Sequence, residues 1–212
     1  MSQHTETELK LACPSEEMWE AVWLSPWLKA LEVPDSRKTE DMEARYYDTP
    51  TLAFRKEKLA FRIRKEGERW VATVKGGGSS QGGLHERQEW NVEISRPAAE
   101  LSIFSQTPVG SQLVKLMGAE PLHVIVVTRF ERRSFCVRTE KGTVIEVAVD
   151  KGVIIAEGKR APILEVELEL KEGSTDEVLA LGDRLMAEYS LVPEGQSKYY
   201  RGLVLAGLVK EK

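Results

Sequence analysis

Three charged residues alternate close to the N-terminus of the chain: Glu6, Glu8 and Lys10, within the run ETELKLA. Residues two apart on a β-strand project from the same face, so these side chains would share one face while Leu9 and Leu11 share the other. Two carboxylates about 7 Å apart repel each other by about 2 kcal/mol at an effective dielectric constant near 20. A strand that carries this repulsion is suited to binding a cation.

A second acidic strand is expected near the other end of the chain, in the run ILEVELELK. Its apolar residues alternate with Glu165, Glu167 and Glu169, so three like charges share one face. The solvated outer face of a one-sided sheet also shows this pattern, and for this strand alone that is the simpler interpretation. Together with Glu6 and Glu8, however, the strand offers the oxygen ligands that suit Mg²⁺ or Mn²⁺.

Basic residues occupy the polar faces of other predicted strands. Arg62 and Arg64 alternate with apolar residues in AFRIRK, and Lys75 ends the run WVATVK. Arg87 lies on the polar face of HERQEWNVEIS, and Asp150 lies on that of TVIEVAVD. Guanidinium and ammonium groups bind phosphate oxygens, whereas carboxylates bind divalent cations. The ligand class that needs both kinds of residue is a metal-bound polyphosphate.

The elements that must position these residues are mainly strands. Sequential antiparallel pairing is expected because several strands are joined by short turns. The predicted fold class is α+β, an eight-stranded antiparallel β-barrel with a few flanking helices. If the helices cover the apolar face, the interior becomes a charged tunnel, and buried charges need partners. Besides the N-terminal strand, the predicted strands span residues 61–64, 70–75, 86–95, 124–138, 143–150, 152–157 and 164–171.

Three helices are expected outside the sheet. Ser15 is a candidate N-cap for the first, and the second is expected over residues 109–117. Ser174 and Glu177 form a capping-box pattern ahead of the third. The glycine-rich run GGGSSQGG, residues 76–83, is interpreted as a flexible hairpin connection, because it lacks the Gly-Lys-Ser/Thr ending of a P-loop and no helix pattern follows it.

The composition describes a globular protein on the charged side of average. The chain has 212 residues, of which 42% are hydrophobic and 30% charged, and this length suits one domain spanning residues 1–212. The net charge of -4 argues against a nucleic-acid partner, and no apolar run approaches the ~20 residues of a membrane span. Cys13 and Cys136 lack zinc or redox spacing, and the polar N-terminus is unlike a signal or transit peptide. A cytoplasmic protein is therefore expected.

These residues together resemble the CYTH family, also called triphosphate tunnel metalloenzymes. The signature Glu6-x-Glu8-x-Lys10 is the most specific mark of the family. The similarity continues through YYDTP, LAFRIRKEGERW, TVKGG, GGLHERQEW, LEVELEL and GQSKYYRG, and so covers nearly the whole chain. Within the family the chain looks most like the bacterial inorganic triphosphatases, and it is expected to stand alone, without the helical CHAD domain that many of them carry.

The resemblance implies an eight-stranded tunnel that binds triphosphate with Mg²⁺ or Mn²⁺. For the phosphate-binding arginine of TRFERRSF, Arg132 is the best match, and Arg129 and Arg133 are alternatives because alternation does not settle the parity. The implied metal ligands are Glu6, Glu8, Asp150, Glu165, Glu167 and Glu169. The implied phosphate-binding residues are Lys10, Arg62, Arg64, Lys75, Arg87, Arg132 and Lys198. Those implied in catalysis are Glu6, Glu8, Lys10, Asp150, Glu165 and Glu167.

The implied activity is hydrolysis of inorganic triphosphate to diphosphate and phosphate, by a monomer or homodimer. Positioning and electrostatics would do most of the catalysis, with a metal-activated water attacking in line. Alternatives on the same fold are a thiamine triphosphatase, a nucleoside triphosphatase and a class IV-type adenylate cyclase. A non-catalytic polyphosphate- or nucleotide-binding module is a further alternative, although anion binding alone needs only the basic residues. His4, His85 and His123 are expected to be surface or turn residues rather than catalytic ones.

Overall fold

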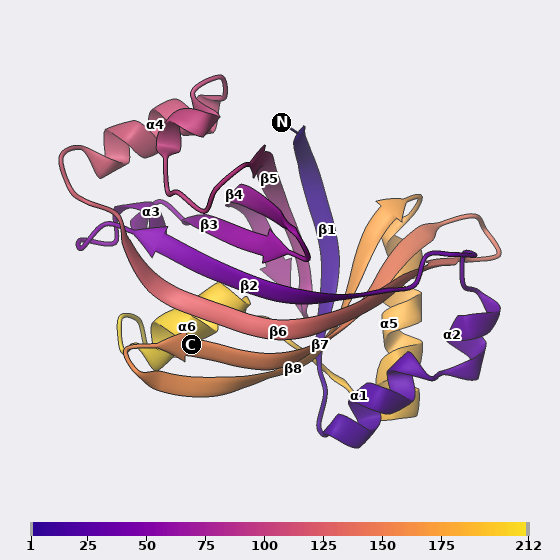
Figure 1. The fold of residues 1–212 in the computed structure, drawn as a ribbon. Coiled ribbons are helices and arrows are strands. Elements are labelled where there is room, and N and C mark those ends of the chain that lie inside the picture. The colour runs from indigo at the N-terminus through magenta and orange to yellow at the C-terminus, as the bar shows by residue number, and fades with distance from the viewer. Residues whose placement is uncertain (1, 211–212) are drawn as a thin grey trace.

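Eight long antiparallel strands close into a barrel in the computed structural model, which describes residues 2–210 and, in the first strand, the side chains from His4 onward (Figure 1). Around the barrel the order is β5–β4–β3–β2–β6–β7–β8–β1, and β1 pairs again with β5. This confirms the predicted α+β fold with an eight-stranded barrel. The strands are β1 (Ser2–Ala12), β2 (Lys38–Asp48), β3 (Leu59–Glu66), β4 (Arg69–Gln81), β5 (Leu84–Ile94), β6 (His123–Arg138), β7 (Val144–Ala156) and β8 (Lys159–Glu172), and the short β9 (Val192–Pro193) adds to β1.

The predicted number of strands is right, but only because two errors cancel: β2 is not predicted, and β7 is predicted as two strands. The sequence does not indicate β2, because its first four residues, KTED, are all polar. The sequence also predicts two strands over residues 143–150 and 152–157, whereas the structure has one, β7. The run Asp150-Lys151-Gly152 has the composition of a turn, yet Gly152 stays in the ladder between Phe130 and Ile163. Pairing on both sides therefore overrides the local turn preference.

The glycine-rich run is not the flexible connection that the sequence suggests. Residues 76–81 continue β4, and the turn to β5 comprises only two residues. The register between β4 and β5 shifts between Gly76 and Ser79, which marks a β-bulge. Gly78 has a φ of +83°, and a Cβ there would lie 1.7 Å from the carbonyl oxygen of Glu86, so only glycine fits. Bulges of this kind are common at the rims of barrels.

Helices cover the apolar outer face of the barrel on two sides (Figure 1). Ser15 caps the first helix as predicted, by accepting the backbone N–H of Met18. Among the residues described, no helix combines the length and apolar character that a membrane span requires. Helices α1 (Glu16–Trp23), α2 (Pro26–Ala30) and α5 (Thr175–Tyr189) pack near β1, β7 and β8, and α3 (Ala53–Lys56), the 3₁₀ turn η1 (Leu101–Phe104) and α4 (Pro108–Met117) pack near β3 to β5.

Half of the capping box predicted for α5 is wrong. Ser174 is the N-cap, and its hydroxyl accepts the N–H of Asp176. Glu177 does not bond back to the N-cap, because its carboxylate accepts the hydroxyl of Thr139 at 2.6 Å. The N–H of Ser174 donates instead to the hydroxyl of Thr143 at 3.1 Å. The helix start is thereby tied to the β6–β7 turn.

One helix that the sequence does not predict, α6 (Lys198–Leu205), packs inside the curved wall formed by β6, β7 and β8 (Figure 1). Tyr199 stacks on Tyr46 of β2 with ring centroids 5.1 Å apart, and Leu203 joins the same apolar cluster. A Cβ at Gly202 would lie 2.3 Å from the side chain of Val126, so glycine permits this close approach. The helix fills part of the barrel and brings Lys198 to the interior.

Candidate active site

The polar faces of the strands enclose a cavity of about 920 Å³. Alternation places the charged side chains on its wall, because the intervening apolar residues pack beneath the outer helices. Asp150 and Glu165 do not line the cavity but contact the Lys198 ammonium just behind the wall. The other predicted site residues all line it: Glu6, Glu8, Lys10, Arg62, Arg64, Lys75, Arg87, Arg132, Glu167, Glu169 and Lys198.

The structure resolves which arginine of TRFERRSF faces the interior. Arg132 donates to both carboxylate oxygens of Asp150, at 2.8 and 2.7 Å. Arg129 is exposed on the outer surface. The guanidinium of Arg133 lies 4.5 Å from the ring centroid of Trp19, beneath α1. Arg132 is therefore the inward residue, and the alternatives Arg129 and Arg133 face outward.

Three carboxylates form a buried group, which we call the inner acidic cluster: Asp150, Glu165 and Glu167. Each offers an oxygen within 4.8 Å of the others, and their side chains belong to residues that are 0%, 1% and 7% exposed. The Lys198 ammonium lies 2.7 Å from Asp150 and 2.9 Å from Glu167, and also contacts Glu165. Lys10 donates to Glu167 at 2.8 Å. The chain itself thus supplies cations to every member of the cluster.

These cations determine the charge state of the cluster. Burial raises the pKa of Glu167, but attraction to Lys10 and Lys198 outweighs burial and holds the pKa well below its usual range. Burial lowers the pKa of Lys10, but Glu167 and Glu8 outweigh that effect and hold the pKa well above its usual range. Both partners therefore stay charged at neutral pH.

A second group, which we call the lumenal carboxylates, faces the cavity directly: Glu6, Glu8 and Glu169. Glu8 pairs in register with Glu169 across β1 and β8. Lys75 donates to Glu6 at 2.7 and 2.5 Å. The buried Oε1 of Glu8 accepts no hydrogen bond from any described residue, although the Lys10 ammonium lies 3.2 Å away. Burial raises the pKa of Glu169. An all-oxygen set with an unbonded buried oxygen fits Mg²⁺ or Mn²⁺.

The β3 side of the cavity carries a surplus of positive charge. Burial lowers the pKa of Arg64, and the nearby cations Arg62 and Arg132 lower it further, against the effect of Glu66. Burial raises the pKa of Tyr46, but Arg62 outweighs it, so the pKa falls below its usual value. The buried Nε of Arg62 donates to no partner among the described residues. A bound polyanion would relieve both the repulsion and the unused donor.

His85 is buried rather than at the surface or in a turn, so that prediction is wrong. The residue is 1% exposed within β5. A guanidinium only donates, so the Nδ1 of His85 accepts from Arg87 at 2.8 Å and the Nε2 donates to the carbonyl of Glu194 at 3.2 Å. Burial lowers the pKa of His85, which favours this neutral ring. His85 links Arg87 to the segment that precedes Lys198.

Two charged residues that the sequence does not predict as site residues complete the ion pairs of the site. Glu89 lies 3.1 Å from the Lys75 ammonium, which it shares with Glu6. The alternation of β5 places this carboxylate on the inner face, so the sequence pattern could have predicted Glu89 as a site residue. Arg201 donates to Glu165 at 2.9 Å. Arg201 could be predicted from the sequence only if α6 were predicted first, because Arg201 follows Lys198 by three residues and shares its face of that helix.

Comparisons with known proteins identify the family of this chain. The family model of the CYTH domain matches residues 4–202. The chain belongs to the CYTH family. An inorganic triphosphatase of Haemophilus influenzae is 33% identical to it over 165 residues, which are 76% of this chain. This CYTH chain spans 44% of the length of that relative.

Solved structures share the CYTH fold with this chain. A putative adenylyl cyclase from Hippeastrum, described as revealing a dominant triphosphatase activity, superposes with a TM-score of 0.64 at 19% identity over 95% of both chains. A putative adenylate cyclase from Bacillus halodurans superposes with a TM-score of 0.57 at 18% identity, over 93% of this chain and 96% of the other. At these identities the likeness establishes the fold alone.

Proposed function

We propose that this CYTH chain hydrolyses inorganic triphosphate to diphosphate and phosphate with the help of Mg²⁺ or Mn²⁺. The observation that carries the proposal is the charge division across the cavity, with surplus arginine charge on β3 and the lumenal carboxylates on β1 and β8. The negative phosphate groups of a triphosphate would bind the arginines of β3, and the metal ions that accompany it would bind the carboxylates. The name of the Haemophilus relative, inorganic triphosphatase, supports the same substrate.

The proposed unit is the whole chain, residues 1–212. The lumenal carboxylates lie on β1 and β8, which pair with each other, while β1 also closes the barrel against β5. The N-terminal strand and the last third of the sequence therefore build one wall together. A piece that lacks β1 or β8 would open the barrel and lose a strand that carries lumenal carboxylates.

The proposed division of labour follows the two acidic groups. The lumenal carboxylates, with the inner acidic cluster behind them, would hold the metal, which when bound neutralises charge on the phosphate oxygens and acidifies a water. The inner acidic cluster would also fix Lys10, Arg132 and Lys198, so that these cations need no rearrangement as charge develops. The phosphate oxygens would be held by Lys10, Arg62, Arg64, Lys75, Arg87, Arg132 and Lys198.

A phosphate-release panel tests the proposal. The substrates are tripolyphosphate, thiamine triphosphate, ATP and long-chain polyphosphate, each with Mg²⁺, with Mn²⁺ and with EDTA. We expect the highest kcat/KM for tripolyphosphate and no release with EDTA. A Glu6→Gln preparation made in parallel controls for contaminating phosphatases. Release from none of the substrates would instead support a binding module, and cyclic AMP formed from ATP would support a cyclase.

A further inference from the structure

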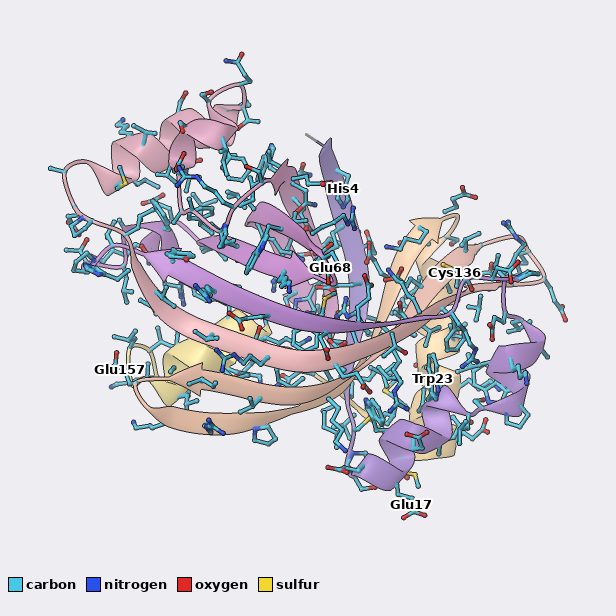
Figure 2. The ribbon with its side chains drawn as sticks, in the orientation of Figure 1. His4, Glu17, Trp23, Glu68, Cys136 and Glu157 are labelled. Carbon is cyan, nitrogen blue, oxygen red and sulfur yellow. The ribbon has the colours of Figure 1, made fainter. Side chains whose placement is uncertain are left out.

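The two ends of the tunnel are built from different segments. Because neighbouring strands run in opposite directions, the β3–β4 turn and the beginnings of β1, β2 and β7 gather at one end. The β4–β5 turn, α3 and the start of α6 gather at the other, where the hydroxyl of Ser80 donates to the carbonyl of Gly195 at 3.4 Å. In Figure 2, the labelled Cys136 and Glu157 mark the two ends of the wall formed by β6, β7 and β8.

The first end carries mostly carboxylates, and we call it the acidic mouth. Five glutamates line the cavity there: Glu40, Glu66, Glu93, Glu146 and Glu169. Lys38, Arg69 and Lys171 line the same mouth, and each is paired with one of these glutamates. The pairs are Lys38 with Glu40 at 3.2 Å, Arg69 with Glu66 at 3.5 Å and Lys171 with Glu169 at 2.8 Å.

The second end is positively charged, and we call it the basic mouth. Arg55 and Lys58 line it together with neutral residues of the β4 bulge and of the segment before α6. Neither side chain forms an ion pair with a carboxylate of residues 2–210. The guanidinium of Arg55 lies 5.6 Å from the ring centroid of Tyr200, and Lys58 is exposed. These two charges are therefore available to an anion in solution.

The basic mouth leads directly to the centre of the cavity. Lys58, Ala60, Arg62 and Arg64 fall at alternate positions and all line the cavity. Position 60 is alanine, so the next cation inward from Lys58 is Arg62, four residues on, or about 13 Å along an extended chain. A polyanion at Lys58 is therefore within the field of Arg62 at about 0.01 M ionic strength, where the Debye length is about 30 Å, and is largely screened from it at physiological ionic strength, where that length is about 8 Å. Arg62 lies 3.8 Å from the carboxylate of Glu89 and Arg64 pairs with Glu66, so Lys58, at the outer end of this row, is its member without an ion pair among the residues described.

We propose that triphosphate enters the tunnel through the basic mouth, drawn by Arg55 and Lys58 toward Arg62, while the acidic mouth repels it. Clefts lined by one sign of charge raise the association rate of the oppositely charged ligand by 10- to 10³-fold. This entrance rests on the proposed function, because it serves the same substrate. It adds two residues, Arg55 and Lys58, whose task is to admit the substrate rather than to bind it during the reaction.

Paired charge reversals at the two mouths test the entrance. Arg55→Glu/Lys58→Glu alters the basic mouth, and Lys38→Glu/Arg69→Glu is the matched control, with the same change in charge at the acidic mouth. The association rate constant is measured by stopped flow with a fluorophore-tagged imidotriphosphate, which is not hydrolysed, in Mg²⁺. At low salt we expect a fall of about 10-fold or more for the first variant, and at most about 2-fold for the control. The difference should shrink as salt is raised.

An equal or larger fall in the control would overturn the proposal, as would an unchanged rate in Arg55→Glu/Lys58→Glu. If that double variant does not fold, Lys58→Glu alone serves, because its side chain is exposed and unpaired, and a fall of about 3-fold is then expected. The binding assay needs no turnover. A wild-type protein that binds the probe but releases no phosphate from tripolyphosphate would therefore refute the proposed function and leave the entrance to be decided by the rates.

Discussion

Glu167 and Glu169 lie two residues apart on the same face of β8, yet their surroundings act on them in opposite directions. Glu167 belongs to the inner acidic cluster, where Lys10 and Lys198 hold its pKa well below the usual range. Glu169 belongs to the lumenal carboxylates, and burial raises its pKa despite Lys171. At Glu167 the cations of the chain outweigh the effect of burial. At Glu169 burial outweighs Lys171, so a further cation would stabilise the charged form of this carboxylate.

This difference separates two roles for acidic residues in one tunnel. In the inner acidic cluster the carboxylates fix cations of the chain, so removing one should leave a buried charge without its partner. Among the lumenal carboxylates the expected partner comes with the substrate, so removing one should affect catalysis more than folding. Substitutions in the inner acidic cluster should therefore lower the free energy of unfolding, and substitutions among the lumenal carboxylates should lower turnover.

The largest change in stability is expected for Asp150→Asn. The substitution keeps the shape of the side chain but removes the charge that binds Arg132 and Lys198. Breaking a buried ion pair by removing one partner costs about 3–5 kcal/mol, so the free energy of unfolding should fall by that amount in urea titrations. Glu169→Gln is the matched control, and it should not destabilise the protein. Similar losses for both variants would remove the distinction between the two groups.

The largest change in catalysis is expected for Glu6→Gln. If Glu6 is a metal ligand as proposed, its loss should lower kcat for tripolyphosphate by about 10²–10³-fold, or about 3–4 kcal/mol of transition-state stabilisation. Folding should be preserved, because Lys75, the ion-pair partner of Glu6, still lies 3.1 Å from a second carboxylate, Glu89. Phosphate release and urea unfolding are measured on the same preparation. Unchanged turnover would exclude Glu6 as a metal ligand.

The sequence alone could place Glu167 and Glu169 on one face but could not tell them apart. Alternation is a local property of the strand, and it correctly assigned the inward residues of β1, β3, β5, β7 and β8. The cations that distinguish Glu167 are Lys10 and Lys198, and Lys198 lies on a helix that packs inside the barrel. Nothing local in the segment SKYYRG indicates an inward-facing helix, because its apolar partners lie on β2, β6 and β7.

The same limit explains the errors in the strands and at His85. Gly152 stays in a strand because β6 and β8 pair with β7 on both sides, which a window of neighbouring residues does not contain. His85 is buried because Glu194, more than a hundred residues away, accepts its Nε2 hydrogen. Long-range partners decide these positions, whereas alternation and caps are decided nearby.

A smaller effect is expected for Arg64→Ala, on the cationic side of the cavity. The side chain is crowded by Arg62 and Arg132, so its removal should not lower the free energy of unfolding beyond the loss of its pairing with Glu66. Loss of one charge-assisted contact to phosphate should weaken tripolyphosphate binding by about 10-fold, equal to about 1.4 kcal/mol. Calorimetric titration measures the binding. An unaltered Kd would remove Arg64 from the phosphate site.

The smallest expected effect is the pH dependence that Glu169 gives to the metal-free protein. An acid whose pKa is raised by folding binds its proton more tightly in the folded state, so ionisation costs stability. The cost is absent below the unfolded pKa of about 4.5 and develops as pH rises through the raised value. In EDTA, the free energy of unfolding of wild type relative to Glu169→Gln should therefore fall over that window.

In the same titration, Glu167 should give the free energy of unfolding a pH dependence of the opposite sign, and it therefore serves as the internal comparison. Its pKa is lowered by folding, so the stabilisation is present above about 4.5 and is lost as pH falls toward the lowered value. The difference between wild type and Glu167→Gln should then shrink on acidification, below the window in which Glu169 acts. Two substitutions on one face of β8 with opposite pH signs would show that Lys198 and Lys10, rather than strand position, set the role of each carboxylate.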